Sequence, residues 1–235
     1  MAAATTHTEP VQRSALVAGA NGLTGRALLR LMLRHGDYHR VQALTRRPLP
    51  VEHPRLANRI LNYEELAARL AGTRCDEAFC CLGAQGGPRA AAAELRHVDL
   101  DLTLAFARAA HAAGVSRLVV ISAAGAARDA RSDFLRIKGE LEAALRTMRF
   151  DSLDILQPGV VVGERPDDGA LDLLRQLTAP LVNVAMVGKL EDRRWISGDD
   201  LAAAMLGAAR GQRRGINVHA GKRLPQLTAA GGRAS

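Results

Sequence analysis

Three glycines spaced three residues apart, Gly19, Gly22 and Gly25, stand near the start of the sequence. They follow a short apolar run, residues 15–18, and precede apolar residues at helical spacing. A glycine turn between a strand and a helix can hold a pyrophosphate, because free N–H groups and the positive end of the helix dipole lie there. We expect Gly19 to form the tight turn, Gly22 to let phosphates approach the backbone, and Gly25 to let the helix pack closely on the strand. The spacing predicts a dinucleotide site, with an ordinary glycine-rich turn as the alternative.

Two arginines, Arg46 and Arg47, follow the second apolar run, about twenty residues after the last glycine. An acidic residue at that place would bind the ribose 2′-hydroxyl and select NAD, whereas arginine suits the 2′-phosphate of NADP. A guanidinium group binds phosphate at two points and is always charged. We therefore predict that NADP(H) is preferred over NAD(H), with Arg46 as the first phosphate ligand and Arg47 as the second. A solvated arginine pair before Pro48 is the alternative.

The elements that position these residues alternate between apolar runs typical of buried parallel strands and segments with helical spacing. This alternation predicts an α/β fold with a doubly wound parallel sheet, in which the ligand lies across the carboxyl ends of the strands. The expected strand order is 3-2-1-4-5-6, with a short last strand at residues 216–219 as an option. The predicted strands are residues 15–18, 41–44, 58–61, 76–82, 117–121 and 150–157, and the predicted helices include residues 64–70, 91–113 and a helix from residue 133.

A chain of 235 residues fits one domain of this class. We expect residues 13–225 to form a single dinucleotide-binding domain of the Rossmann type. Residues 163–198 are its least patterned part and are predicted to be an insert. Residues 1–12 and 226–235 are short and are predicted to be flexible tails.

The composition narrows the range of functions. The net charge of +8 comes from arginines spread along the chain and only 3% of the residues are aromatic, which disfavours nucleic acid as a partner. The cysteines, Cys75, Cys80 and Cys81, and the seven histidines show no zinc-ligand spacing, so we expect no metal site and place the cysteines in the core. We find no signal peptide and no apolar run of about 20 residues, which predicts a soluble cytoplasmic protein without membrane contact.

Several short motifs resemble one protein superfamily. Residues 19–25, Gly-Ala-Asn-Gly-Leu-Thr-Gly, resemble the turn of the extended and atypical short-chain dehydrogenases/reductases. Residues 79–83 (Phe-Cys-Cys-Leu-Gly), 137–142 (Ile-Lys-Gly-Glu-Leu-Glu) and 157–160 (Gln-Pro-Gly-Val) are similar to the subgroup related to the Tat-interacting oxidoreductase-like protein. The resemblance spans about residues 13–210 and rests on the order and spacing of the motifs together.

The resemblance implies further contacts with NADP(H). Asn62 would hydrogen-bond the adenine and Tyr63 would pack near it, although Asn62 could equally cap a helix. Lys138 would hold the nicotinamide ribose, and the insert would form a small C-terminal lobe that shapes the substrate pocket. The other cofactor-binding residues that the resemblance implies are Asn21, Leu23 and Thr24 at the turn, Leu82, Gly83 and Ala84 near the ribose, and Pro158 and Val160 near the nicotinamide.

The catalytic residues of that superfamily are only partly present. Hydride transfer there uses a tyrosine and a lysine four residues later on one helical face, with a serine after the fifth strand. Lys138 and Ser122 occupy the lysine and serine positions, but Phe134 stands in place of the tyrosine. The only tyrosines, Tyr38 and Tyr63, lie on other predicted elements.

Two functions therefore stay open. The protein could be an NADP-dependent oxidoreductase in which another group, such as Asp133, supplies the proton or solvent acts as the acid. It could instead be a non-catalytic sensor of NADP(H) that acts through a regulatory protein partner. The sequence identifies no small-molecule substrate and leaves a homodimer open. Asp99, at a place where many relatives carry an asparagine, enters neither prediction.

Overall fold

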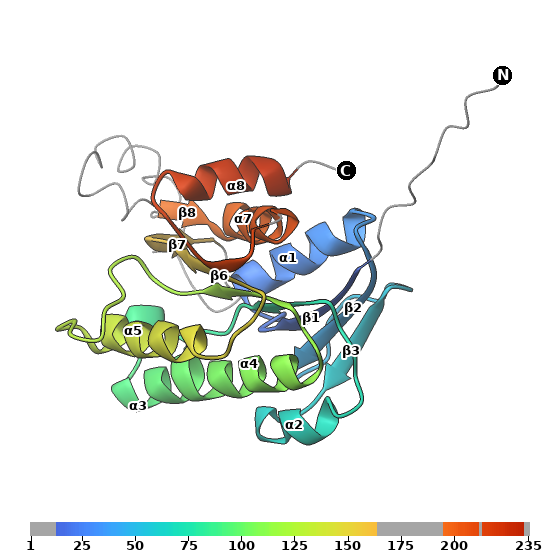
Figure 1. Cartoon of the computed structure of the whole chain (residues 1–235), viewed down its shortest axis with the longest axis horizontal. Helices are drawn as coiled ribbons and strands as arrows, with labels where there is room; N and C mark the ends of the chain where they lie inside the picture. The colour runs from blue at the N-terminus through green and yellow to red at the C-terminus, as the bar shows by residue number, and fades with distance from the viewer. Residues whose placement is uncertain (1–12, 164–194, 212, 233–235) are drawn as a thin grey trace.

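The fold is that of a computed structural model, which describes residues 13–163, 195–211 and 213–232. Its main sheet has seven parallel strands in the order β3-β2-β1-β4-β5-β6-β9 (Figure 1). The predicted doubly wound order is thus confirmed, and β9 is the additional last strand. The strands are β1 (Arg13–Ala18), β2 (Tyr38–Thr45), β3 (Leu56–Ile60), β4 (Glu77–Cys80), β5 (Arg117–Ile121), β6 (Ser152–Gln157) and β9 (Gly215–Ala220).

Helices cover both faces of this sheet (Figure 1). Along β1, Leu16 and Ala18 point into the core on one face, whereas Ala15 and Val17 point into the core on the other. Burial on both faces explains why the strands appear as continuous apolar runs in the sequence. One face carries α1 (Leu23–Arg34), α7 (Gly198–Arg210) and α8 (Arg223–Gly231); the other carries η1 (Tyr63–Glu65), α2 (Leu66–Arg69), α3 (Ala92–Leu95), α4 (Thr103–Ala112) and α5 (Asp133–Arg146).

The long helix predicted for residues 91–113 is not α-helical throughout. Between α3 and α4 the backbone forms a π-helical segment, η3 (Arg96–Leu102), which continues both helices. Such wide turns are rare in proteins and often occur at functional sites. Here the segment carries Asp99, which is buried.

The flexible C-terminal tail predicted from residue 226 is wrong for residues 226–231, which form most of α8. Small residues make this possible, because α8 packs against α7 with its backbone. A Cβ atom on Gly231 would lie 1.7 Å from the carbonyl oxygen of Ala203, and one on Gly207 would lie 2.1 Å from that of Leu227. This contact leaves no pattern of large apolar residues in the sequence.

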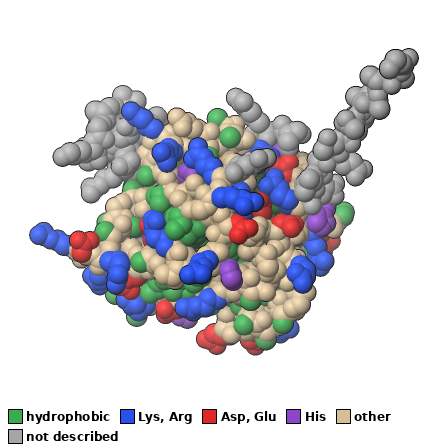
Figure 2. Space-filling view, viewed as in Figure 1, with side chains coloured by type: hydrophobic (Ala, Val, Ile, Leu, Met, Phe, Trp, Pro, Cys, Tyr) green, Lys and Arg blue, Asp and Glu red, His purple; other side chains and the backbone are tan. Residues whose placement is uncertain are grey.

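Beyond the main sheet, β7 (Val160–Val162) and β8 (Trp195–Ser197) pair in parallel. Most of the predicted insert, the predicted N-terminal tail and residues 233–235 lie outside the described residues. In the parts that are described, no helix is long and apolar enough to cross a membrane. Figure 2 shows basic side chains scattered over one face of the molecule, with acidic side chains between some of them.

Candidate functional site

The glycine turn joins β1 to α1 at the carboxyl edge of the sheet. Gly19 adopts a left-handed backbone conformation, with φ of +76°, which favours glycine. A Cβ atom on Gly25 would lie 2.1 Å from the carbonyl oxygen of Gly19, so only glycine lets α1 approach the turn this closely. The tight turn and the close packing expected of these two glycines are therefore present, whereas the phosphate contact of Gly22 stays a prediction.

The N-terminus of α1 is open to a ligand. Its N-cap residue, Gly22, has no side chain with which to cap the helix, and the first turn contains no acidic residue. The first N–H groups of a helix have no partner within the helix, and here they come from Leu23, Thr24 and Gly25. Asn21 and Gly22 are exposed beside them. An uncapped helix start beside a glycine turn fits the pyrophosphate of a dinucleotide.

The two predicted phosphate-binding arginines lie next to this turn. Arg46 and Arg47 are exposed and directly follow β2. The side-chain amide of Asn21 donates a hydrogen bond of 3.2 Å to the backbone oxygen of Arg47, which connects the arginine segment to the glycine turn. Within the described residues, neither guanidinium group forms a hydrogen bond or an ion pair. Both charges are thus available to an anionic ligand.

Tyr63 lies beneath the glycine turn. Its hydroxyl accepts a hydrogen bond from the backbone N–H of Gly19, at 3.2 Å, and donates one to the backbone oxygen of Leu44, at 2.9 Å. The side chain is buried, and burial raises the pKa of the phenol, so the hydroxyl keeps its proton. Asn62 accepts a hydrogen bond from the N–H of Glu64 at the start of η1, as the helix-cap alternative requires. Adenine contacts of Tyr63 and Asn62 stay predictions.

Lys138 and Asp99 form a buried ion pair, which the sequence did not reveal. The ammonium nitrogen of Lys138 lies 2.5 Å from Oδ1 of Asp99. The other carboxylate oxygen of Asp99 accepts a hydrogen bond of 2.9 Å from the N–H of Ala84. Asp99 therefore connects the family's lysine position to the segment after β4 that is predicted to lie near the ribose. The one feature of the sequence that could have indicated this pair is Asp99 itself, which stands where many relatives carry an asparagine.

Phe134 lies on the same face of α5 as Lys138. The Lys138 ammonium is 5.8 Å from the centroid of the Phe134 ring. That Phe134 stands in place of the family's tyrosine stays a prediction. Phenylalanine has no proton to transfer. Asp133, the alternative donor, is exposed and pairs with Arg136. Adjacent helical residues point about 100° apart, and the structure gives no support for Asp133 as the missing acid.

Ser122 is also engaged. Its hydroxyl donates a hydrogen bond of 2.5 Å to Oε1 of Glu142, and the side-chain amide of Gln157 donates to the same oxygen at 2.8 Å. Ser122 and Glu142 are buried. Glu142 follows Lys138 by four residues and Phe134 by eight, which places all three on one face of α5. That spacing could have revealed Glu142, but its partners Ser122 and Gln157 come from distant segments, just after β5 and at the end of β6.

The remaining predicted residues lie at the same edge of the sheet, after the ends of β4 and β6. Gly83 is exposed, Leu82 is half-buried and Ala84 is buried. Pro158 is buried and its backbone oxygen accepts a hydrogen bond from Ala124, whereas Val160 is 43% exposed. Because all seven strands are parallel, the structure brings the segments after β1, β2, β4, β5 and β6 to one edge.

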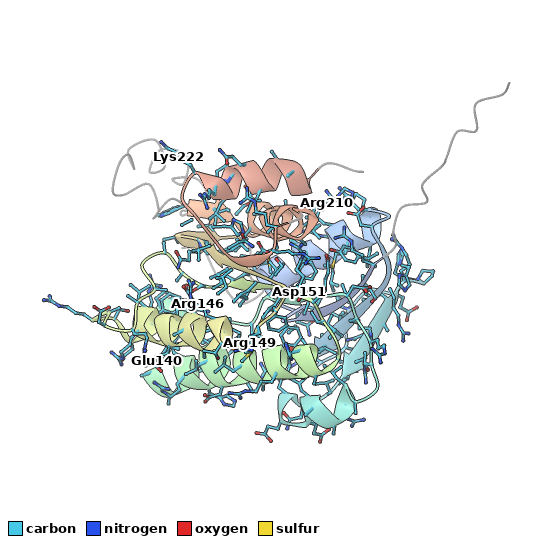
Figure 3. The ribbon with its side chains drawn as sticks, viewed as in Figure 1. Glu140, Arg146, Arg149, Asp151, Arg210 and Lys222 are labelled. Atoms are coloured by element: carbon cyan, nitrogen blue, oxygen red, sulfur yellow. The ribbon has the colours of Figure 1, made fainter. Side chains whose placement is uncertain are left out.

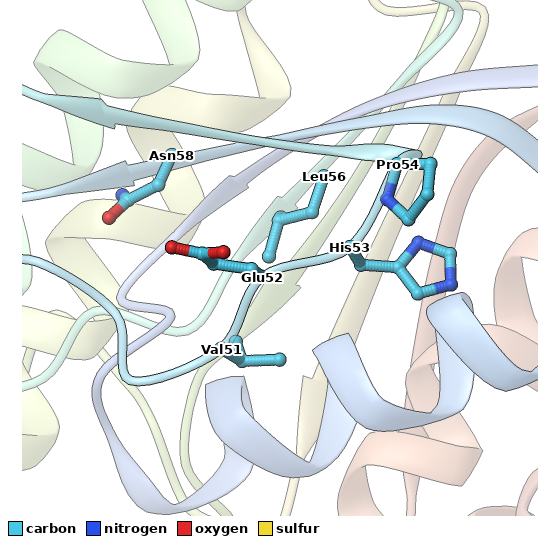
Figure 4. Close-up of a pocket in the computed structure, with 6 residues that line it drawn as sticks. All are labelled: Val51, Glu52, His53, Pro54, Leu56 and Asn58. Carbon is cyan, nitrogen blue, oxygen red and sulfur yellow. The ribbon is translucent and has the colours of Figure 1, made fainter.

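The cysteines of the β4 region are core residues rather than nucleophiles. Burial raises the pKa of Cys80 to about 11, and it raises the pKa of Cys75 and Cys81 as well. Among the described residues, no three His, Cys, Asp or Glu side chains are arranged to hold a metal ion. A pocket opens beside β3 (Figure 4); it is lined by Val51, Glu52, His53, Pro54, Leu56 and Asn58.

Comparison with known proteins gives matches in sequence and matches in structure. The sequence model of the NAD(P)H-binding family matches residues 19–159. The mitochondrial protein FMP52 of Eremothecium gossypii is 33% identical over 152 residues, 65% of this chain and 68% of that protein. The protein HTATIP2 of Rattus norvegicus is 32% identical over 161 residues, which are 66% of this chain and 65% of that protein.

Solved structures show the same fold at lower sequence identity. MoeE5 in complex with UDP-glucose and NAD superposes with a TM-score of 0.65 and 23% identity, over 92% of this chain and 81% of that one. The oxidoreductase ylbE from Lactococcus lactis superposes with a TM-score of 0.64 and 15% identity, over 92% of this chain and 95% of that one.

Proposed function

The chain belongs to the NAD(P)H-binding family, and on that premise we propose that it binds NADP(H), in preference to NAD(H), across the carboxyl edge of its sheet. One observation supports the preference: the hydrogen bond from Asn21 to the backbone of Arg47 connects the glycine turn to two arginines whose guanidinium groups have no partner among the described residues. A ligand with a pyrophosphate and a 2′-phosphate could contact both the turn and the arginines.

Each part of the edge has its own role in this proposal. The N–H groups at the start of α1 bind the pyrophosphate, and the guanidinium groups of Arg46 and Arg47 bind the 2′-phosphate. Lys138 holds the nicotinamide ribose while it stays paired with Asp99. A bound NADP(H) would supply or accept a hydride at its nicotinamide end, for which Pro158 and Val160 are the predicted contacts.

An oxidoreductase of the atypical short-chain dehydrogenase/reductase type is the first candidate function. The second is a non-catalytic NADP(H) sensor that acts through a protein partner, and three observations favour it. Phe134 has no proton to give, the Ser122 hydroxyl donates to Glu142, and Asp133 is exposed. A cytoplasmic location stays a prediction, since the FMP52 relatives are named as mitochondrial proteins.

Calorimetric titration with NADPH and with NADH tests the binding proposal. We expect the protein to bind NADPH about tenfold more tightly, a difference of about 1.4 kcal/mol, which is a reasonable value for one phosphate–arginine contact. Arg46→Ala should remove most of this preference, whereas Arg108→Ala, an exposed arginine on α4, should not. Gly25→Ala should lose both ligands. Equal binding of NADPH and NADH by the unmodified protein would contradict the proposed preference.

The two candidate functions differ in what binding leads to. Substrate-dependent loss of NADPH absorbance across a panel of aldehydes and ketones would support the oxidoreductase. Binding of a protein partner that depends on NADPH, without turnover of any carbonyl compound, would support the sensor.

A further inference from the structure

Tyr63 connects the glycine turn to the end of β2, the two parts of the proposed NADP(H) site that would bind phosphate groups. Its single hydroxyl bridges the N–H of Gly19 in the glycine turn and the backbone oxygen of Leu44 in β2. Leu44 lies two residues before Arg46, so the tyrosine connects the pyrophosphate turn to the strand that carries the arginines. The positive charge of Arg46 lowers the pKa of this phenol, against the larger effect of burial, so the arginine lies within electrostatic reach of Tyr63.

Asn58 holds the arginine loop, residues 45–49, at both of its ends. Its amide nitrogen donates a hydrogen bond of 2.7 Å to the hydroxyl of Thr45, and its amide oxygen accepts one of 2.9 Å from the N–H of Leu49. Thr45 and Leu49 flank the two arginines in the sequence. Figure 4 shows Asn58 on β3, beside the segment that carries Val51 and Glu52. One side chain thus closes the loop that presents both guanidinium groups.

We propose that Tyr63, Asn58 and Asn21 are positioning residues that set the preference for NADP(H), because together they fix the spacing between the glycine turn and the arginine loop. The inference rests on the proposed function and adds to it the residues that create the specificity. A ligand with two anionic groups gains from both contacts only when the protein holds them at the right separation beforehand. NADH uses the turn alone, so it gains little from a fixed spacing.

Tyr63→Phe tests this directly, because it removes the hydroxyl and keeps the ring. We expect the ratio of NADPH to NADH affinity, measured by calorimetry, to fall about threefold to tenfold, as the loss of one bridging hydroxyl allows. The matched control is Tyr38→Phe. Tyr38 is also a buried tyrosine. It is the first residue of β2, at the opposite end of that strand from Leu44, and its hydroxyl donates to Glu77 at 2.6 Å. Its removal should leave the affinity ratio unchanged.

A combined variant separates positioning from a general loss of stability. If Tyr63 acts through the arginine loop, Tyr63→Phe should cause almost no further fall in the affinity ratio in a protein that already carries Arg46→Ala. Independent, additive effects of the two substitutions would overturn the inference. Asn58→Ala perturbs the same loop through a different side chain. It should lower the ratio of NADPH to NADH affinity when Arg46 is present, and leave the ratio unchanged when it is combined with Arg46→Ala.

The outcomes distinguish this inference from the function on which it rests. An unmodified protein without NADPH preference would overturn both. An unmodified protein that prefers NADPH, with the same ratio in folded Tyr63→Phe and Asn58→Ala variants, would overturn the positioning role alone. A ratio that falls equally in Tyr63→Phe and Tyr38→Phe would also overturn it, because the change would then reflect the loss of any buried tyrosine hydroxyl.

Discussion

The ammonium of Lys138 lies 2.5 Å from a carboxylate oxygen of Asp99, and each side chain is only 3% exposed. Two charges taken out of water stabilise a fold only when each has a close partner and further hydrogen bonds. Asp99 meets this condition through the N–H of Ala84, and Lys138 lies 3.4 Å from the backbone oxygen of Ile121. The pair therefore connects α5, η3, the segment after β4 and the last residue of β5 at the edge where the proposed site lies.

Asp99→Ala should reduce the free energy of unfolding by about 3–5 kcal/mol, because it leaves the Lys138 ammonium buried without a counter-charge. Asp99→Asn should cost less, since an amide oxygen can still accept the hydrogen bond from Ala84. Urea denaturation measures both losses. Asp133→Ala is the control: in the described part of the chain this carboxylate forms an exposed pair with Arg136, so its removal should cost less than about 1 kcal/mol. Equal losses for the alanine and asparagine variants would contradict the expectation.

Phe134→Tyr should restore a proton donor beside Lys138. The Phe134 ring already lies 5.8 Å from the ammonium, and a positioned general acid contributes at least about 10²-fold to a rate. We expect NADPH-dependent reduction of an aldehyde or ketone to rise by about that factor over the unmodified protein. Phe134→Leu, which has no hydroxyl, should show no gain. If the tyrosine variant binds NADPH and its rate stays at the starting level, a second catalytic group must be unavailable. Ser122 is the first candidate, because its hydroxyl donates to Glu142.

The sequence predicted the sheet better than the details around it. Apolar runs located the strands, because strands such as β1 are buried on both faces and leave a continuous signal. The strand order followed from the doubly wound fold class that their alternation with helices predicts. The π-helical turn at Asp99 and the docking of α8 through Gly231 left none, since neither depends on large apolar residues.

The same contrast holds within the site. Short motifs predicted the glycine turn between β1 and α1, because that feature is local in sequence. The roles that the resemblance assigns to Lys138 and Phe134 stay predictions. The partners of Lys138, Ser122 and Tyr63 could not be predicted, because each partnership joins distant segments: Asp99 with Lys138, Glu142 with Ser122, and Gly19 with Tyr63.

Asp154, the buried carboxylate in the middle of β6, should be costly to remove. It pairs with Arg117 at 3.2 Å and with His219 at 2.8 Å, and its side chain is 1% exposed. Asp154→Ala should lower the free energy of unfolding by about 3–5 kcal/mol, because the Arg117 charge loses a buried partner. Asp199→Ala removes an exposed pair with Arg30 and should cost at most about 1 kcal/mol. Thermal and urea unfolding of the two variants would show whether burial decides the difference.

His35 should make the fold less stable in mild acid. The ring is buried, and within the described residues neither of its nitrogens has a hydrogen-bond partner. Burial lowers the pKa of His35 below its ordinary value of 6.5, and the charges of Arg210 (Figure 3) and Arg34 lower it further, whereas Asp37 raises it. The folded state therefore binds a proton at His35 less readily than the unfolded state does.

The sign of the pH dependence follows from this difference. Above a pH of about 6.5 the ring is neutral in both states, and stability is independent of His35. As the pH falls through the unfolded value toward the lower folded value, the unfolded chain takes up a proton first, so the free energy of unfolding decreases. Replacing the ring by an apolar one, as in His35→Phe, should flatten the decrease between pH 6.5 and pH 5 in urea denaturation. A variant whose stability falls with pH as steeply as that of the unmodified protein would show that His35 is not the group responsible.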